Sequence, residues 1–85
     1  MTHELKTWPE FFAGVKSGRK TFEIRKYDRG FKVGDILRLR EWDYHAEAYT
    51  GEELEREVTY VLCGGPYLAE GYCCMGIKEA DSDVE

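Results

Sequence analysis

Near the N-terminus, hydrophobic residues recur at the spacing of an amphipathic helix. The stripe consists of Trp8, Phe11, Phe12 and Val15 at positions i, i+3, i+4 and i+7. Thr7 stands before it and Glu10 follows three residues later, which predicts a capping box, and Gly18 suits the helix end. We expect one short helix here, with its aromatic residues in the core rather than exposed to a ligand.

Beyond Gly18 the hydrophobic pattern changes to alternation, which is typical of strands. We expect strands at residues 4–6, 21–26, 36–42, 57–62 and 72–78. In the second of these, Phe22 and Ile24 are predicted to face the core, which leaves Glu23 and Arg25 together on the opposite face.

The segments between these strands are polar or rich in glycine. Residues 43–53 form an acidic hairpin connection, with a return turn expected at Thr50 and Gly51. A loop starting at Cys63 contains Tyr67, an aromatic residue that could stack on a base. Residues 1–78 are expected to form a single domain, and residues 79–85 a disordered acidic tail.

The formal net charge of −5 is distributed unevenly along the 85 residues. Residues 16–40 contain nine basic and three acidic side chains, whereas residues 41–57 contain seven acidic and one basic. This sequence therefore predicts a dipolar domain, in which a basic region could still meet nucleic acid or a protein partner.

Composition narrows the remaining possibilities. There is no apolar run of 18 residues and no signal-peptide pattern, so we expect a soluble cytoplasmic protein. The three cysteines are an odd number, and the two histidines lie at no metal-binding spacing. We therefore expect buried thiols, no metal and no cofactor.

The strongest candidate chemistry lies where the expected helix meets the expected strand. Lys20, Glu23 and Arg25 would form a cation–anion–cation cluster there, provided that the regular strand begins after Lys20 or a bulge redirects it. Such a cluster suits a polar, partly anionic ligand. The alternative is a structural ion pair that stabilises the corner.

These residues, with Gly18, form the pattern G-x-K-x-x-E-x-R, which resembles the signature of ASCH domains. ASCH domains are small β-barrel modules related to the RNA-binding PUA domains. The resemblance runs from His3 to Lys78 and is nearest to very small phage and bacterial proteins of unassigned function. It implies an α+β, mostly β pseudo-barrel of about five strands with one N-terminal helix, and a cleft that recognises RNA or a nucleotide.

Three further residues could extend this cleft: Arg38, Arg40 and Tyr67. The alternative for the two arginines is a solvated strand face.

Two other functions remain open. Some ASCH proteins resemble amidohydrolases that act on N4-acetylcytidine with a threonine nucleophile and a lysine. Lys20 matches that lysine, but Glu23 stands at the nucleophile position, where a carboxylate is a poor substitute. The third hypothesis is a phage-type module that binds a protein partner through its charged faces.

Overall fold

The computed structural model describes residues 1–80 and contains one helix and five strands. The elements are β1 (Thr2–Thr7), α1 (Pro9–Lys16), β2 (Phe22–Lys26), β3 (Ile36–Asp43), β4 (Ala48–Cys63) and β5 (Tyr72–Glu79). This confirms the expected α+β, mostly β fold, a small pseudo-barrel with an N-terminal helix.

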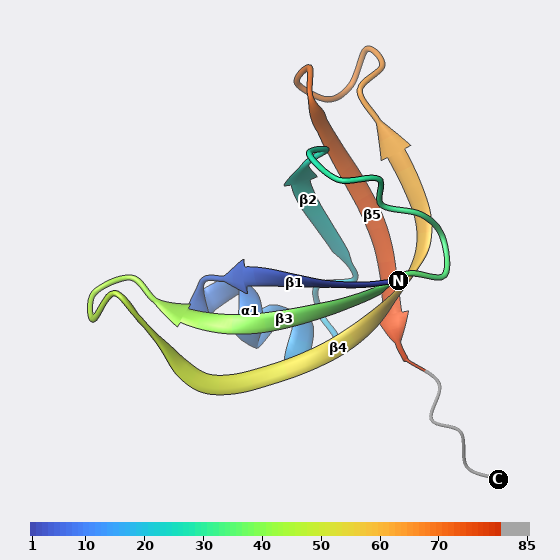
Figure 1. The fold of residues 1–85 in the computed structure, drawn as a ribbon. Helices are drawn as coiled ribbons and strands as arrows, with labels where there is room; N and C mark the ends of the chain where they lie inside the picture. Colours follow the sequence, from blue (N-terminus) through green and yellow to red (C-terminus); the bar gives the residue numbers. More distant parts are fainter. Residues whose placement is uncertain (81–85) are drawn as a thin grey trace, which may run out of the picture.

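The strands form one sheet in the order β1-β3-β4-β5-β2. β1 runs parallel to β3, and every other neighbouring pair is antiparallel. The 16-residue β4 joins the two halves, since its first part pairs with β3 and its last part with β5. Its register with β5 shifts between Val58 and Tyr60. The sheet curls into a half-barrel whose two edge strands are β1 and β2 (Figure 1).

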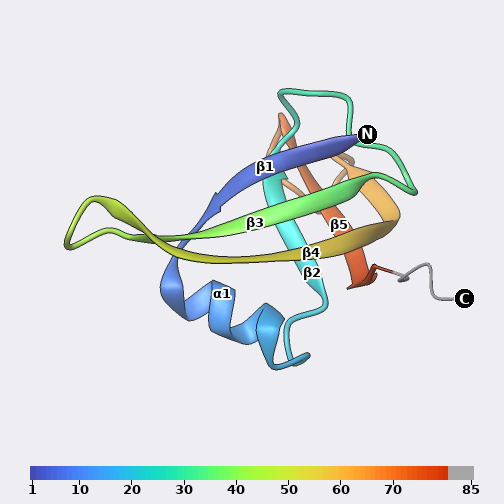
Figure 2. The same ribbon diagram turned by 60° about the horizontal axis from the view of Figure 1, so that its bottom comes forward.

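The core lies on the inner side of this curl, where α1 packs beneath β1, β3 and β4 (Figure 2). It comprises Leu5, Phe12, Val15, Phe31, Leu37, Leu39, Val58, Cys73, Met75 and Ile77. Arg56 on β4 donates a hydrogen bond of 3.2 Å to the main-chain oxygen of Val15, near the end of α1. This carbonyl also accepts a hydrogen bond from the Gly18 amide at 3.0 Å, so Arg56 is its second donor, and a basic side chain here suits the negative end of the helix dipole.

A buried polar cluster fastens the start of β1 to the start of β3. The Asp35 carboxylate lies 2.9 Å from His3 Nε2 and accepts hydrogen bonds from the Lys32 amide at 3.0 Å and the Met1 amine at 3.2 Å. The His3 ring also packs edge-on against Phe31. Burial of Asp35 is tolerated because its carboxylate is well supplied with donors.

The expected capping box is wrong. Thr7 is the buried last residue of β1, and the N-cap is Trp8, which makes no side-chain capping bond. Within the hydrophobic stripe, Phe12 and Val15 are buried as expected, but Trp8 and Phe11 remain 48% and 47% exposed. An eight-residue helix on a curled sheet contacts the core along a narrower face than the stripe covers.

The return turn expected at Thr50 and Gly51 is also wrong, because both residues lie inside β4. The hairpin turns earlier, at residues 44–47, where Glu47 has a φ of 54°. The Asp43 carboxylate accepts hydrogen bonds from the His45 and Ala46 amides and closes this turn. Gly51 has a φ of 97°, so its glycine serves a strand irregularity rather than the turn.

At the C-terminal end, β5 includes Glu79, so the strand takes the first residue of the expected tail. Residues 81–85 lie outside the described residues. Within the described part of the chain, no helix is long and apolar enough to cross a membrane.

Candidate functional site

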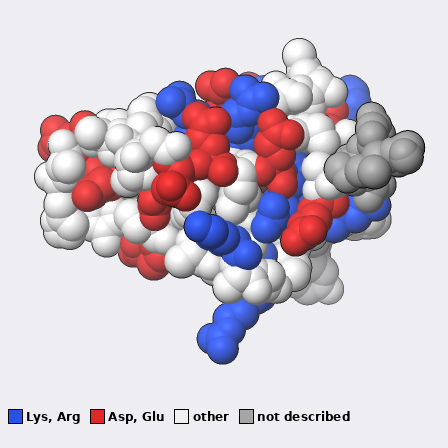
Figure 3. Space-filling view, turned by 90° about the horizontal axis from the view of Figure 1, so that it is seen from below, with Lys and Arg blue, Asp and Glu red and all other residues white. Residues whose placement is uncertain are grey.

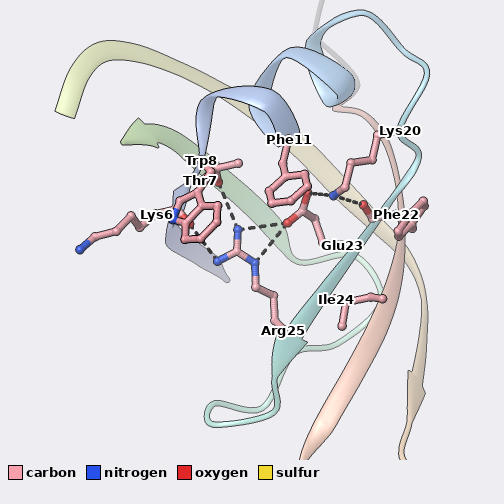
Figure 4. Close-up of a pocket in the computed structure, with 9 residues that line it drawn as sticks. All are labelled: Lys6, Thr7, Trp8, Phe11, Lys20, Phe22, Glu23, Ile24 and Arg25. Atoms are coloured by element: carbon pink, nitrogen blue, oxygen red, sulfur yellow. Dashed lines mark hydrogen bonds and ion pairs between the residues drawn. The ribbon is translucent and has the colours of Figure 1, made fainter. Parts of the chain in front are cut away.

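The gap between the two edge strands holds a pocket of about 420 Å³ (Figure 4). It is lined by Lys6, Thr7, Trp8, Phe11, Lys20, Phe22, Glu23, Ile24 and Arg25. These residues come from the end of β1, the first turn of α1, the turn that follows α1, and β2. The curl of the sheet therefore creates the pocket, since it brings both edge strands close to one helix.

Glu23 is the buried anion at the centre of the site, and its side chain is only 3% exposed. One of its oxygens accepts from the Lys20 ammonium at 2.5 Å, and the other accepts two hydrogen bonds from the Arg25 guanidinium, at 3.0 and 3.1 Å. The predicted cation–anion–cation cluster is therefore present. Its two cations share one carboxylate, so the cluster keeps a net positive charge.

The predicted orientation of β2 is wrong. Glu23 is buried, whereas Phe22 and Ile24 are 43% and 50% exposed and form one wall of the pocket. Strand alternation predicts which residues share a face. It does not establish which face is buried, and the prediction assumed that the apolar face was. Here the polar set can be buried because its charges are mutually paired.

Lys20 reaches the cluster because β2 begins only at Phe22, which meets the condition that the regular strand begins after Lys20. Its main-chain amide donates to the Gly14 carbonyl at 2.9 Å. A side chain at Gly14 would place its Cβ 3.2 Å from the Lys20 Cβ, which explains the glycine within α1. The Lys20 ammonium also donates to the Phe22 carbonyl at 2.7 Å.

Arg25 connects the two edges of the sheet. From β2, its guanidinium donates to the Lys6 carbonyl at 3.0 Å and to the Thr7 hydroxyl at 3.1 Å, both on β1. Thr7 in turn donates to the Leu5 carbonyl at 3.3 Å. The Lys6 side chain itself points away from Arg25 and lies 3.9 Å from the ring centre of Trp42 (Figure 4).

Both cations retain hydrogen-bonding capacity. An ammonium has three N–H donors, and Lys20 uses two of them. A guanidinium has five, and Arg25 uses four. Their side chains are 19% and 22% exposed, so each can donate once to a ligand.

Aromatic rings enclose the other side of the pocket. Trp8 and Phe11 are stacked with ring centres 6.1 Å apart and planes inclined by 14°, and Tyr44 packs against Trp8 at 4.8 Å. The Lys20 ammonium lies 4.9 Å from the ring centre of Phe22. The pocket thus combines apolar faces with charged donors.

Arg38 and Arg40 do not line this pocket. They lie on the outer face of β3 in ion pairs with Glu55 at 3.0 Å and Glu53 at 2.9 Å on β4, and both also contact Glu4. On the side seen in Figure 3, acidic and basic side chains are interspersed rather than separated into two patches. The basic and acidic segments of the sequence neutralise one another because β3 and β4 are neighbours.

Tyr67 also lies apart from the pocket. It is 86% exposed in the loop between β4 and β5 and does not line the pocket. Thus the structure brings together Lys20, Glu23 and Arg25 of the six candidate residues and leaves out the other three.

Sequence reasoning missed Thr7, Trp8 and Phe11 as pocket residues. Their pattern indicated a helix cap and a core stripe, and no local signal separates a half-exposed aromatic residue from a buried one. The unusually aromatic start of a short helix that leads into the charged motif was the available hint.

No disulfide joins the three cysteines, and Cys63 on β4 lies directly opposite Cys73 on β5. The expectation of buried thiols is confirmed for Cys73, which is fully buried, but is wrong for Cys63, which is exposed, and Cys74 is only partly buried. Among residues 1–80, no three His, Cys, Asp or Glu side chains are grouped as ligands of a metal ion.

The fold and the pocket define a small half-barrel module with a positively charged, aromatic-walled site. The chain belongs to the family described as domain of unknown function DUF3850, whose model matches residues 2–77. It is also similar to an uncharacterized 12.9 kDa protein in the GpA 3′ region of Escherichia phage P2, with 39% identity over 59 residues. That match covers 69% of this chain and 52% of the phage protein, so the chain spans about half the length of this curated relative.

Proposed function

We propose that this protein is a nucleotide-recognition module that binds a base of single-stranded RNA in the pocket between β1 and β2. The observation that carries the proposal is the pairing of free N–H donors on Lys20 and Arg25 with the aromatic wall of Trp8 and Phe11. Proteins recognise unpaired bases by stacking on aromatic rings and by hydrogen bonds to the base edge. The resemblance to ASCH domains supports the same function.

The hydrogen-bonding character of the pocket favours bases that present acceptors. Glu23 is buried, and both of its oxygens are engaged, so its main role is to hold Lys20 and Arg25 in place. The remaining donors suit the carbonyl oxygens of uracil or guanine better than an amino group. We therefore expect uridine to bind more tightly than cytidine.

Hydrolysis of N4-acetylcytidine is the less supported function. Glu23, at the matching nucleophile position, is buried in ion pairs, and the hydroxyl of Thr7 donates to a main-chain carbonyl of its own strand. No free nucleophile therefore faces the pocket from these two positions. Incubation with N4-acetylcytidine should release no cytidine, as judged by chromatography.

Isothermal titration with uridine and with a short oligouridylate tests the proposal. Lys20→Met should weaken binding about tenfold, because it removes one charge-assisted hydrogen bond while keeping the apolar part of the side chain at similar length. Trp8→Ala should have an effect of similar size through lost stacking, which contributes about 1–3 kcal/mol per base.

Arg38→Met is the matched control, since it removes one positive charge from the outer face of β3. It should leave binding of uridine unchanged. Equal weakening by Lys20→Met and Arg38→Met would mean only nonspecific attraction and would refute the proposal.

A further inference from the structure

We infer that the site continues past Arg25 into a second, smaller pocket that binds the phosphate of a neighbouring nucleotide. This inference rests on the proposed function and specifies the ligand as a strand of at least two nucleotides rather than a free nucleoside. It is carried by the structure on the far side of Arg25, where an adjacent pocket has a different chemical character.

The second pocket has a volume of about 140 Å³, one third of that of the first. It is lined by Leu5, Arg25, Lys26, Asp28, Arg29 and Phe31, so Arg25 belongs to both pockets. Four of these six residues are charged, and three of the four are basic. This pocket suits a small anionic group, whereas the larger, aromatic-walled pocket suits a base.

Two arginines donate hydrogen bonds to main-chain carbonyls along the edge of β1 that does not pair with β3. Arg25 donates to the Lys6 carbonyl at 3.0 Å, and Arg29 donates to the Glu4 carbonyl at 3.4 Å. These carbonyls are two residues apart on one strand, which corresponds to about 7 Å. Both guanidinium groups are therefore anchored by the same strand edge, one beside each pocket.

Arg29 keeps more free donors than Arg25. One of its N–H groups pairs with Asp28 at 3.2 Å and another with Glu4, which leaves three of its five donors free. Its side chain is 42% exposed, so a ligand can reach it. Planar guanidinium groups with free paired donors are well suited to phosphate oxygens.

The two pockets together form a strip whose net charge is opposite in sign to that of the whole protein. Around Arg25 the two pockets bring together the basic residues Lys20, Arg25, Lys26 and Arg29 and the acidic residues Glu23 and Asp28. The strip is therefore positive on a protein whose formal net charge is −5. A strand whose base enters the first pocket would carry its adjoining phosphate toward Arg29.

The experiment compares uridine, which has no phosphate, with the dinucleotide uridylyl-uridine, which has one between its bases. Wild-type protein should bind the dinucleotide about tenfold more tightly than uridine. Arg29→Ala should abolish this difference while leaving uridine binding unchanged. For a short oligouridylate, the same variant should reduce the slope of log affinity against log salt by about 0.7, as expected for one lost phosphate contact to a single strand.

Lys78→Ala on β5 is the control for net charge and should preserve the advantage of the dinucleotide. Lys26→Ala provides a second variant of the pocket if Arg29→Ala lowers the thermal stability. Equal affinity of wild-type protein for uridine and the dinucleotide would overturn the second pocket alone. Failure of wild-type protein to bind uridine or the dinucleotide would overturn the proposed function as well.

Discussion

At the scale of single residues, Glu23 has the central role, because one buried carboxylate positions two cations. Without that anion, Lys20 and Arg25 would repel one another across the pocket. When Glu23 is present, Lys20 and Arg25 together donate five hydrogen bonds to carboxylate and main-chain carbonyl oxygens. Arg25 donates a sixth to the Thr7 hydroxyl. Preorganised donors of this kind lose little conformational entropy when a ligand binds.

Replacing Glu23 should therefore destabilise the fold as well as the site. We expect Glu23→Gln to lower the free energy of unfolding by about 3 kcal/mol, because it leaves two partly buried cations without an anion. Urea unfolding monitored by tryptophan fluorescence would measure the change. Glu53→Gln removes an exposed partner of Arg40 and should cost less than about 1 kcal/mol. Equal losses in the two variants would contradict the central position of Glu23.

Cys63 and Cys73, which lie opposite one another on neighbouring strands, should differ sharply in their reactivity toward alkylating agents. Burial raises the pKa of the Cys73 thiol, with the neighbouring Cys63 adding to the effect, and Cys63 is exposed. Iodoacetamide should therefore alkylate Cys63 in the folded protein and Cys73 only after denaturation, because the thiolate is the reacting species. Peptide mass spectrometry would identify the order. Early labelling of Cys73 in the folded protein would contradict the burial of this strand.

At the scale of secondary-structure elements, two local devices hold the curled sheet in shape. The cluster around Asp35 fastens β1 to β3, and the register shift near Thr59 lets β4 bend from one half of the sheet to the other. Gly76 of β5 lies against this bend, where a Cβ would stand 2.6 Å from the Thr59 hydroxyl oxygen. Each device can be tested separately.

Stability should depend on the ionisation of Asp35 in acid. Burial alone would raise the pKa of this carboxyl, but hydrogen bonds from His3, the Lys32 amide and the Met1 amine outweigh it and hold the pKa below its usual value. A carboxyl with a lowered folded-state pKa stabilises the fold above its unfolded pKa of about 3.9. That stabilisation is lost as the pH falls through the folded pKa.

Asp35→Asn should therefore be less stable than wild type at pH 6, and the difference should shrink as the pH falls below about 4. Urea unfolding across this range would measure it. Asp28→Asn, at an exposed position, should change stability by less than about 0.5 kcal/mol throughout. A difference between Asp35→Asn and wild type that stays constant down to low pH would rule out the ionic contribution.

The bend in β4 should make Gly76→Ala destabilising. Its Cβ would overlap the Thr59 hydroxyl, and overpacking of this kind costs about 1–3 kcal/mol. Thr59→Ala removes the obstructing oxygen, so the double variant should recover most of the loss, whereas Thr59→Ser should not. A double-mutant cycle by chemical denaturation would measure the coupling. Additive effects of the two substitutions would contradict the close approach.

Element types could be predicted from the sequence because they depend on local periodicity, whereas several orientations could not. The helix and at least part of each strand follow from the hydrophobic pattern, but the pattern does not predict the first part of β4, residues 48–56, most of which was expected to be a hairpin connection. Which face of β2 points inward depends on the ion pairs of Glu23 with Arg25 and with Lys20, and Lys20 lies outside the strand. The position of the hairpin turn was predicted wrongly, because Gly51 indicated a turn but occupies an irregular position within β4.

The candidate site was predictable only in its charged part. Lys20, Glu23 and Arg25 lie within six residues, so their clustering is a local property. The aromatic wall requires α1 to sit over the gap between β1 and β2, which is a property of the whole curled sheet. Long-range pairing of that kind leaves no signal in a window of a single strand.

At the scale of the whole molecule, folding rearranges the charge pattern of the sequence. The basic segment that contains Arg38 and Arg40 pairs with the acidic segment that contains Glu53 and Glu55 across neighbouring strands. Much of the dipole expected from the sequence is thereby cancelled on the outer face. The strip around Arg25 keeps its excess of positive charge, which directs attention to the gap between the edge strands rather than to an extended charged face.

The central claim, that this gap recognises RNA, is tested most directly by a two-dimensional NMR titration with a short oligouridylate at low and moderate salt. The largest shifts should come from Trp8, Phe22 and Ile24 on the pocket walls and should persist at moderate salt, and Lys20→Met should reduce them. Weak shifts scattered over basic residues and erased by salt would indicate only nonspecific attraction and would contradict the claim. A protein partner would then be the better hypothesis.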